Sequence, residues 1–128
     1  MSANAQSSDP GQGFGRERRL TSAGQFRRVF VEPRRVVLGG FVVLYRSNGL
    51  DRPRLGLAIS KKCARRAIDR NRLKRLARES FRRAYRRLPG VDIVVMCTPR
   101  ATAESNQRLF DALEQVWIHL ESSSCVES

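Results

Sequence analysis

The chain has 128 residues, with 25 lysines and arginines against 12 acidic residues, and therefore a formal net charge of +13. This length supports one domain with a core, and 41% hydrophobic residues exclude a globally disordered chain. No apolar run approaches the ~20 residues that span a bilayer, and the polar first residues lack the apolar segment of a secretory signal. The charge predicts a polyanionic partner, either a nucleic acid or an anionic membrane surface.

Residues that commonly carry catalysis or bind metals are few. Cys63, Cys97 and Cys125 lie far apart without a CxxC pair, a pattern that fits a reducing cytosol and argues against a disulfide framework or a zinc site. The only histidine is His119, so we find no nucleophile–histidine set, and no glycine-rich phosphate loop is present. We therefore expect a cytoplasmic protein without a catalytic set or metal site of its own, with Cys97 as a small buried hydrophobe.

The first predicted element is a short helix that follows a polar, disordered extension over residues 1–15. Thr21 or Ser22 caps this helix, which runs to about Val31 and buries one side of its surface. Its end is predicted at Glu32-Pro33, because the residue before a proline is disfavoured in helical conformation.

Four strands are predicted next along the chain. Their ranges are 35–38, 41–45, 54–60 and 91–97, with Gly39-Gly40 forming the turn between the first two. The last of them, VDIVVMC, is almost continuously apolar and is therefore expected to be covered on both faces.

Two longer helices are predicted over residues 67–88 and 104–120, and a polar tail over 121–128 is expected to be disordered. The closing helix carries five apolar residues on one face: Leu109, Leu113, Val116, Trp117 and Leu120. The order α-β-β-β-α-β-α predicts a single α+β domain over residues 16–120, with helices packed on a small sheet.

Most of the positive charge lies in one segment. Residues 61–87 contain 13 basic and two acidic side chains, a net charge of +11, which leaves +2 for the rest. At about 100° per residue, one stripe of the helix is predicted to face the core: Leu73, Leu76, Ala77, Ser80, Phe81, Ala84 and Leu88. Arg72, Arg75, Arg82 and Arg86 fall on the opposite side, whereas Arg70 and Lys74 lie beside the stripe.

Arginines recur four residues apart along this helix, at positions 78, 82 and 86 and again at 83 and 87. Such like-charged pairs repel each other unless a polyanion neutralises them, so we favour a polyanion-binding helix over an ordinary solvated face. A helix lying on a membrane surface is the other alternative, but its apolar stripe is needed for the core.

The residues around this helix resemble those of the protein subunit of bacterial ribonuclease P. In that family an Arg-Asn-Arg signature begins a basic helix, and a strand ending in Ser-Lys-Lys precedes it. Here the strand reads RLGLAISKK and the helix RNRLKRLARESFR. The resemblance spans roughly residues 16–120, from Arg19-Leu20 to the closing helix with Trp117.

The resemblance implies a two-layer α/β sandwich whose small mixed sheet contains a left-handed crossover through the basic helix. Domain IV of elongation factor G and a small-subunit ribosomal protein domain share this fold. The implied function is maturation of the tRNA 5′ end: a catalytic RNA performs the hydrolysis with Mg²⁺, and the protein binds that RNA and the 5′ leader of precursor tRNA. We therefore expect no catalytic residue, no cofactor bound by the protein alone, Mg²⁺ held mainly by RNA, and no membrane or required protein partner.

The resemblance also implies roles for individual residues. Contacts with the catalytic RNA fall on Lys61, Lys62, Arg70, Asn71, Arg72, Lys74, Arg75 and Arg78. The leader would lie in a cleft lined by Phe26, Phe30, Leu44 and Ala58, where stacking on aromatic rings tolerates any sequence.

Three of these positions have a second interpretation. Asn71 could instead bond the local backbone, and Phe26 and Phe30 could be plain core residues. Tyr45 would take the place of Leu44 in the cleft if the strand register shifts by one residue.

Two other functions are compatible with the sequence. A structural RNA-binding protein, such as a ribosomal component of the same fold, would bind ribosomal RNA without preferring precursors that carry leaders. A stand-alone nuclease would need positioned acid–base groups, whereas Asp51, Asp69, Glu79 and Asp92 are scattered along the chain.

Overall fold

A four-stranded mixed sheet lies at the centre of the computed structural model, which describes residues 18–20 and 22–127. The strands are β2 (Arg34–Leu38), β3 (Phe41–Ser47), β4 (Arg54–Leu57) and β5 (Val91–Cys97). The helices are α2 (Ala23–Phe30), α3 (Ala67–Ala84) and α4 (Asn106–Glu127), with the 3₁₀ segments η3 (Tyr85–Arg87) and η4 (Pro99–Ala103). The predicted order of elements is confirmed, while residues 1–15 and the alternative cap Thr21 lie outside the described residues.

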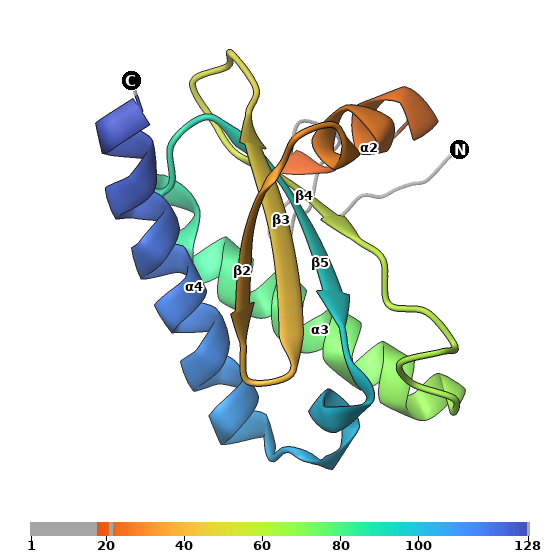
Figure 1. Ribbon diagram of the computed structural model, residues 1–128. Helices are drawn as coiled ribbons and strands as arrows, with labels where there is room; N and C mark the ends of the chain where they lie inside the picture. Colours follow the sequence, from red (N-terminus) through yellow and green to blue (C-terminus); the bar gives the residue numbers. More distant parts are fainter. Residues whose placement is uncertain (1–17, 21, 128) are drawn as a thin grey trace, which may run out of the picture.

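The sheet has the spatial order β2-β3-β5-β4, so the last strand along the chain lies inside it. β3 is antiparallel to both β2 and β5, whereas β4 and β5 are parallel. Parallel strands need a crossover connection, and α3 supplies it on the face of the sheet away from α2 (Figure 1). The crossover is left-handed, opposite to the common rule, as the resemblance implied.

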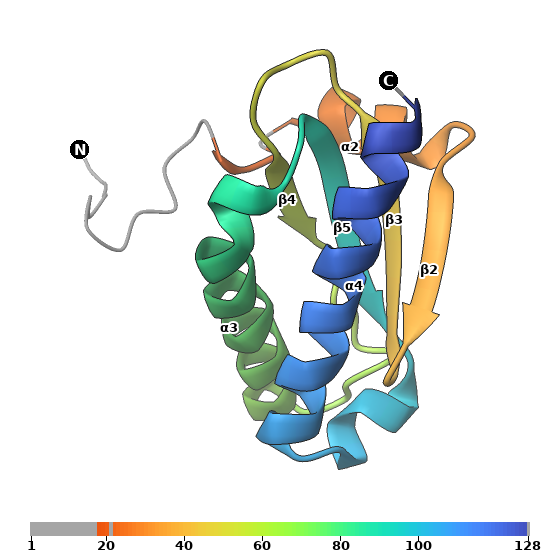
Figure 2. The same cartoon turned by 90° about the vertical axis from the view of Figure 1, so that its left-hand side faces the viewer.

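The main core lies between the sheet and the pair α3 and α4, which pack against each other on the same face (Figure 2). Every residue of the predicted α3 stripe is buried, as are the five apolar residues predicted for the closing helix. Trp117 is fully buried, and its indole N–H donates to Ser80 Oγ at 2.7 Å. This bond satisfies the two polar groups where the helices meet, so the serine in the apolar stripe leaves no unpaired donor.

A smaller core lies on the opposite face, where α2 packs on the sheet (Figure 1). Ser22 begins the helix by accepting a bond from the Gln25 N–H at 3.1 Å, while the Gln25 side chain accepts from the Ser22 N–H. This reciprocal cap satisfies two amides that the first turn leaves free. The helix ends at Phe30, and Glu32 with φ 53° turns the chain toward β2, as the predicted stop at Glu32-Pro33 requires.

Three predicted boundaries are wrong by three residues or more. The basic helix, predicted to run to Leu88, ends as an α-helix at Ala84 and continues as η3 to Arg87. β4 ends at Leu57, three residues before the predicted end at Ser60, because the chain there leaves the sheet toward α3. α4 continues to Glu127, so residues 121–127 are helical where a disordered tail was expected. Extending an existing helix needs no new nucleation, because each added residue forms one more backbone hydrogen bond. Neither proline nor glycine interrupts these positions.

Candidate RNA-binding surface

The eight residues expected to contact the catalytic RNA lie on α3 and on the turn that precedes it. Five of them are exposed: Lys61, Lys62, Asn71, Arg75 and Arg78. Three are half-buried: Arg70, Arg72 and Lys74. We call this set the basic surface. Its exposed members can meet a phosphate directly, whereas the half-buried members also contact protein groups.

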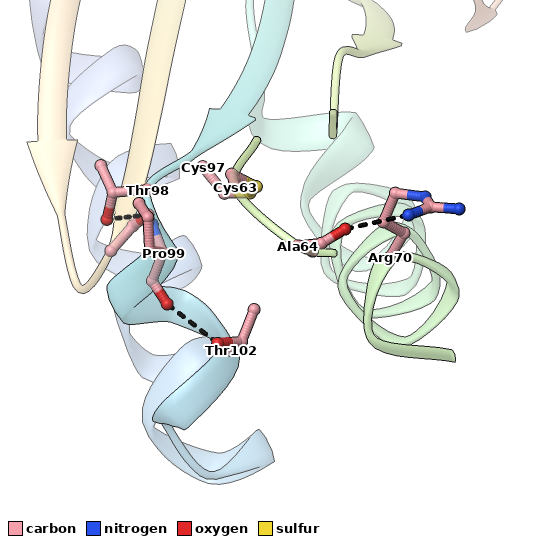
Figure 3. The surroundings of a disulfide bond; sticks show 8 residues. Cys63, Ala64, Arg70, Cys97, Thr98, Pro99 and Thr102 are labelled. Carbon is pink, nitrogen blue, oxygen red and sulfur yellow. Dashed lines mark hydrogen bonds between the residues drawn. A yellow bond between two sulfur atoms is a disulfide. The ribbon is translucent and has the colours of Figure 1, made fainter. Parts of the chain in front are cut away.

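Arg70, in the first turns of α3, is bonded to the segment before the helix. Its Nη1 donates to the carbonyl oxygen of Ala64 at 3.0 Å (Figure 3). The same nitrogen donates to the Arg65 carbonyl, also at 3.0 Å. These carbonyls belong to the turn between β4 and α3, which forms no β-sheet hydrogen bonds with a neighbouring strand. The guanidinium therefore fixes the position of the turn that carries Lys61 and Lys62.

Arg72 reaches in the other direction, toward the segment between η4 and α4. Nη1 donates to Asn106 Oδ1 at 2.7 Å and to the Glu104 carbonyl at 3.3 Å, and Nη2 donates to the Thr102 carbonyl at 3.1 Å. Because a guanidinium has five N–H donors in a rigid fork, one side chain joins three groups of another segment. Arg72 thus links the start of α3 to the start of α4.

A pocket of about 370 Å³ lies where α2, β4 and α3 meet. Its lining combines apolar and cationic side chains: Arg19, Leu20, Phe26, Leu55, Gly56, Leu57, Lys74 and Arg78. A Cβ at Gly56 would lie 2.6 Å from the Phe26 ring, so only glycine lets that ring approach β4 this closely. The structure therefore brings a predicted cleft residue together with two predicted RNA contacts.

The cations at this pocket influence one another. Desolvation by the surrounding residues lowers the pKa of Arg78 from its ordinary value, and the positive charge of Arg19 lowers it further. Both effects disfavour the charged guanidinium in the free protein. A phosphate placed between Arg19 and Arg78 would reverse the repulsion, so the pocket is suited to an anion with an apolar or aromatic neighbour.

The predicted cleft residues lie on the α2 face of the sheet. Leu44 is buried there with Val94, and Ala58 packs against the same cluster. Tyr45 points to the opposite face, where it joins the main core, so the alternative register is wrong. The Phe26 ring packs against this cluster, whereas Phe30 remains 47% exposed at the end of α2.

The turn before α3 contains a feature that the sequence prediction missed. Cys63 and Cys97 form a disulfide, with their Cα atoms 5.8 Å apart (Figure 3). The argument against a disulfide framework did not anticipate this single pair, and the expectation of Cys97 as a plain buried hydrophobe is wrong. Spacing along the chain failed to reveal the pair because 34 residues separate them, and the parallel pairing of β4 with β5 brings the two segments together.

The four acidic residues considered as acid–base groups, Asp51, Asp69, Glu79 and Asp92, lie beside arginines. Arg54 donates from Nε and Nη2 to the two carboxylate oxygens of the buried Asp92, each at 2.8 Å, and this pairing raises the pKa of Arg54. Asp51, Asp69 and Glu79 each lie within 4.0 Å of an arginine as well. In the part of the chain that the structure describes, no three histidine, cysteine or acidic side chains gather as metal ligands.

One further residue of the site was not assigned a role from the sequence. Arg19 lines the pocket, and its backbone lies beside Leu55 in a parallel bridge. The adjacent Leu20 N–H donates to the Leu55 carbonyl at 3.1 Å. The sequence places Arg19 next to a buried leucine, but its position beside α3 depends on this pairing with the edge strand.

A basic helix beside a pocket that combines cations with an aromatic ring is typical of proteins that bind nucleic acid by phosphate contacts and stacking. The family model for ribonuclease P matches residues 14–121. The ribonuclease P protein component of Thioalkalivibrio sulfidiphilus is 51% identical over 114 residues, which cover 89% of this chain and 94% of the relative. That of Nitrosococcus oceani is 47% identical over 108 residues, covering 84% and 91%.

Solved structures agree with this match. The RNase P protein of Thermotoga maritima has a TM-score of 0.69 at 34% identity, covering 77% of this chain and 94% of that one. A Staphylococcus aureus RNase P protein mutant, described as having defective mRNA degradation activity, has a TM-score of 0.73 at 30% identity, covering 78% and 85%.

The chain belongs to the ribonuclease P protein family. It is thus the protein component of the ribonucleoprotein endoribonuclease that matures the 5′ end of tRNA, and its partner is the RNA subunit of that enzyme. Among the described residues, none of the helices is both long and apolar enough to cross a bilayer.

Proposed function

We propose that this chain binds the ribonuclease P RNA through the basic surface and the 5′ leader of precursor tRNA through the α2 side of the sheet, while the RNA carries the catalysis. The observation that carries the proposal is the pocket that joins Phe26 to Arg19, Lys74 and Arg78. An aromatic ring beside cations suits a single strand, because bases stack on the ring and phosphates meet the charges.

The division between the two RNAs follows from the two sides of α3. Lys61, Lys62, Asn71 and Arg75 are exposed away from the pocket and suit the phosphates of a folded RNA. Lys74 and Arg78 line the pocket and could contact either RNA. We propose that they neutralise phosphates where the leader passes the catalytic RNA, which favours precursor over mature tRNA.

The acidic side chains support an RNA-held metal. Since Asp51, Asp69, Glu79 and Asp92 all lie beside arginines, we propose that Mg²⁺ in the assembled enzyme is held mainly by RNA. We further propose that the enzyme works in the cytoplasm and requires no second protein.

Cleavage of a precursor tRNA by the matching RNA subunit tests this function. The reaction is run at low Mg²⁺ with and without this chain, and with no other protein. We expect the chain to accelerate cleavage and to increase affinity for a precursor with a leader more than for mature tRNA. The proposal fails if the chain leaves the cleavage rate unchanged. It also fails if the chain binds ribosomal RNA more tightly than it binds the ribonuclease P RNA or the precursor tRNA.

Phe30 allows a separate test of leader binding. Because its side chain is 47% exposed, we expect Phe30→Ala to lower the free energy of unfolding by less than about 1 kcal/mol. Loss of a stacking ring should weaken leader-dependent affinity by about 1–2 kcal/mol. Ile118→Ala, which truncates a 42% exposed residue of α4 on the opposite face, is the matched control and should leave that affinity unchanged. Equal losses in both variants would contradict a leader site at Phe30.

A second candidate function is RNA cleavage by the protein alone. A Staphylococcus aureus RNase P protein mutant described as having defective mRNA degradation activity raises this candidate, whereas the arginine-paired acids disfavour it. Incubating this chain with an mRNA in the absence of the RNA subunit separates the two functions. Cleavage under these conditions would add a protein-borne activity to the one proposed above.

A further inference from the structure

The cysteine pair connects the end of strand β5, which sheet hydrogen bonds order, with the turn between β4 and α3, which lies outside the sheet. Cys97 is the last residue of β5, paired with Phe41 of β3. The next residue, Thr98, donates from its N–H and from Oγ1 to the Gly40 carbonyl, at 2.8 and 3.2 Å. One end of the disulfide is thus anchored in the centre of the sheet.

Cys63 lies in the turn between β4 and α3, directly after Lys61 and Lys62. Within this turn the Cys63 and Ala64 N–H groups donate to the Ser60 carbonyl at 3.2 and 3.0 Å. The β4–β5 pairing ends before it, with the bond from the Ala58 N–H to the Val95 carbonyl. The lysine-bearing turn is therefore connected to the sheet through Cys63.

Arg70 holds the other side of the same turn through the Ala64 carbonyl (Figure 3) and the Arg65 carbonyl. The turn is thus held by a guanidinium on the helix side and by sulfur on the sheet side, in addition to the burial of Ile59, Cys63 and Ala64 in the main core. The first attachment is a pair of hydrogen bonds to backbone carbonyls. The second depends on the oxidation state of two cysteines.

We propose that Cys63 and Cys97 form a reversible disulfide that regulates affinity for the ribonuclease P RNA by fixing the turn that carries Lys61 and Lys62. This inference rests on the proposed function in one respect, the contact of these two lysines with RNA. The Cα separation of 5.8 Å falls in the usual range for disulfides, so the bond requires no backbone movement.

The chemistry is a thiol–disulfide exchange with a small-molecule disulfide such as oxidised glutathione. Cys97 is half-buried and Cys63 only 7% exposed, so the Cys97 thiolate is the group that attacks the incoming disulfide. It bonds one sulfur and releases the other as a thiol. The Cys63 thiolate then attacks Cys97 Sγ and displaces the second thiol. Two protein thiols are oxidised, one small disulfide is reduced, and the two protons pass to the departing thiolates.

Fixing the turn removes part of the ordering cost of RNA binding. Restraining the backbone of the lysine-bearing turn in advance is expected to tighten binding roughly twofold to tenfold. The oxidised protein should accordingly bind the RNA more tightly than the reduced protein, and amides of residues 60–65 should exchange hydrogen more slowly.

The experiment equilibrates the full chain in glutathione buffers of increasing oxidation, with the pair's state measured by mass after thiol alkylation. Affinity for the RNA subunit and amide exchange are then measured on the same samples. Cys125→Ser retains the pair and should respond as the wild type does. Cys97→Ala cannot form the bond and should give the reduced-state affinity in every buffer.

The outcomes separate the two proposals. If the disulfide forms and slows amide exchange but RNA affinity stays the same, regulation by the pair is overturned. The same holds if the folded protein forms no disulfide, or if Cys97→Ala shows the oxidant response of the wild type. Failure of both the oxidised and the reduced protein to bind the RNA subunit would instead contradict the proposed function.

Discussion

The arginines at the start of α3 and those in its middle belong to the same helix but contact different groups. Arg70 and Arg72 donate to protein oxygens in two neighbouring segments. Arg75, one turn later, is exposed and makes no hydrogen bond or ion pair with any residue that the structure describes. One helix therefore contains arginines that shape the basic surface and arginines that offer their charge to a ligand.

Residue type alone does not distinguish these two groups. Arg70 and Arg72 are separated by about 200° around the helix, and each reaches a different segment: the turn before α3, or the corner before α4. Asn71 between them is exposed. In this chain the Arg-Asn-Arg sequence thus presents its amide to solvent while its arginines hold the surrounding backbone.

Arg72→Ala is expected to have the largest effect on stability. The substitution removes three hydrogen bonds from a charged donor and leaves the Thr102 and Glu104 carbonyls without that partner. We expect the free energy of unfolding to fall by about 2–3 kcal/mol, measured by urea denaturation. The salt dependence of RNA binding should change less than for an exposed arginine, because three hydrogen bonds to protein oxygens already engage the guanidinium.

Arg72→Lys is the matched control for this prediction. Lysine keeps the charge but lacks the planar fork that reaches several oxygens at once, so it should recover less than half of the lost stability. If Arg72→Ala instead retains full stability and lowers the salt slope by a whole phosphate contact, Arg72 belongs with the exposed arginines.

Arg70→Ala should have a smaller effect, confined to the turn before α3. Two bonds are lost, one of them at the exposed surface, so we expect a destabilisation of about 1 kcal/mol. Amides in residues 61–66 should exchange faster, while those in the middle of α3 keep their protection. Uniformly faster exchange throughout α3 would show that Arg70 stabilises the helix rather than the turn.

Periodicity predicted which side of α3 faces the core, because burial of an apolar stripe repeats every helical turn. The same pattern could not predict the contacts of Arg72, whose partners lie 30–34 residues later in the chain. Periodicity gives the direction in which a side chain leaves its helix. The segment it meets there depends on how the elements pack.

The order of the strands in the sheet likewise could not be predicted from local sequence. The apolar run at Val91–Cys97 correctly indicated a strand covered on both faces, but local sequence carries no signal for the order β2-β3-β5-β4. That order places Cys97 beside the turn of Cys63 and Leu44 opposite Val94. The handedness of the crossover came from the family resemblance alone, since general rules favour the opposite hand.

Arg75→Ala is expected to have the smallest effect on stability and the most specific effect on binding. Since its side chain is exposed, the free energy of unfolding should change by less than about 0.5 kcal/mol. The slope of log K against log salt for the RNA subunit should fall by about 0.7–0.9, the value for one lost phosphate contact. Arg52→Ala, in the loop between β3 and β4, removes the same charge at the end of the sheet away from the β4–α3 turn and should leave the slope unchanged. An equal decrease in both variants would mean that RNA binding depends on net charge alone. The structural difference between Arg75 and the protein-bonded Arg70 and Arg72 would then have no consequence for RNA binding.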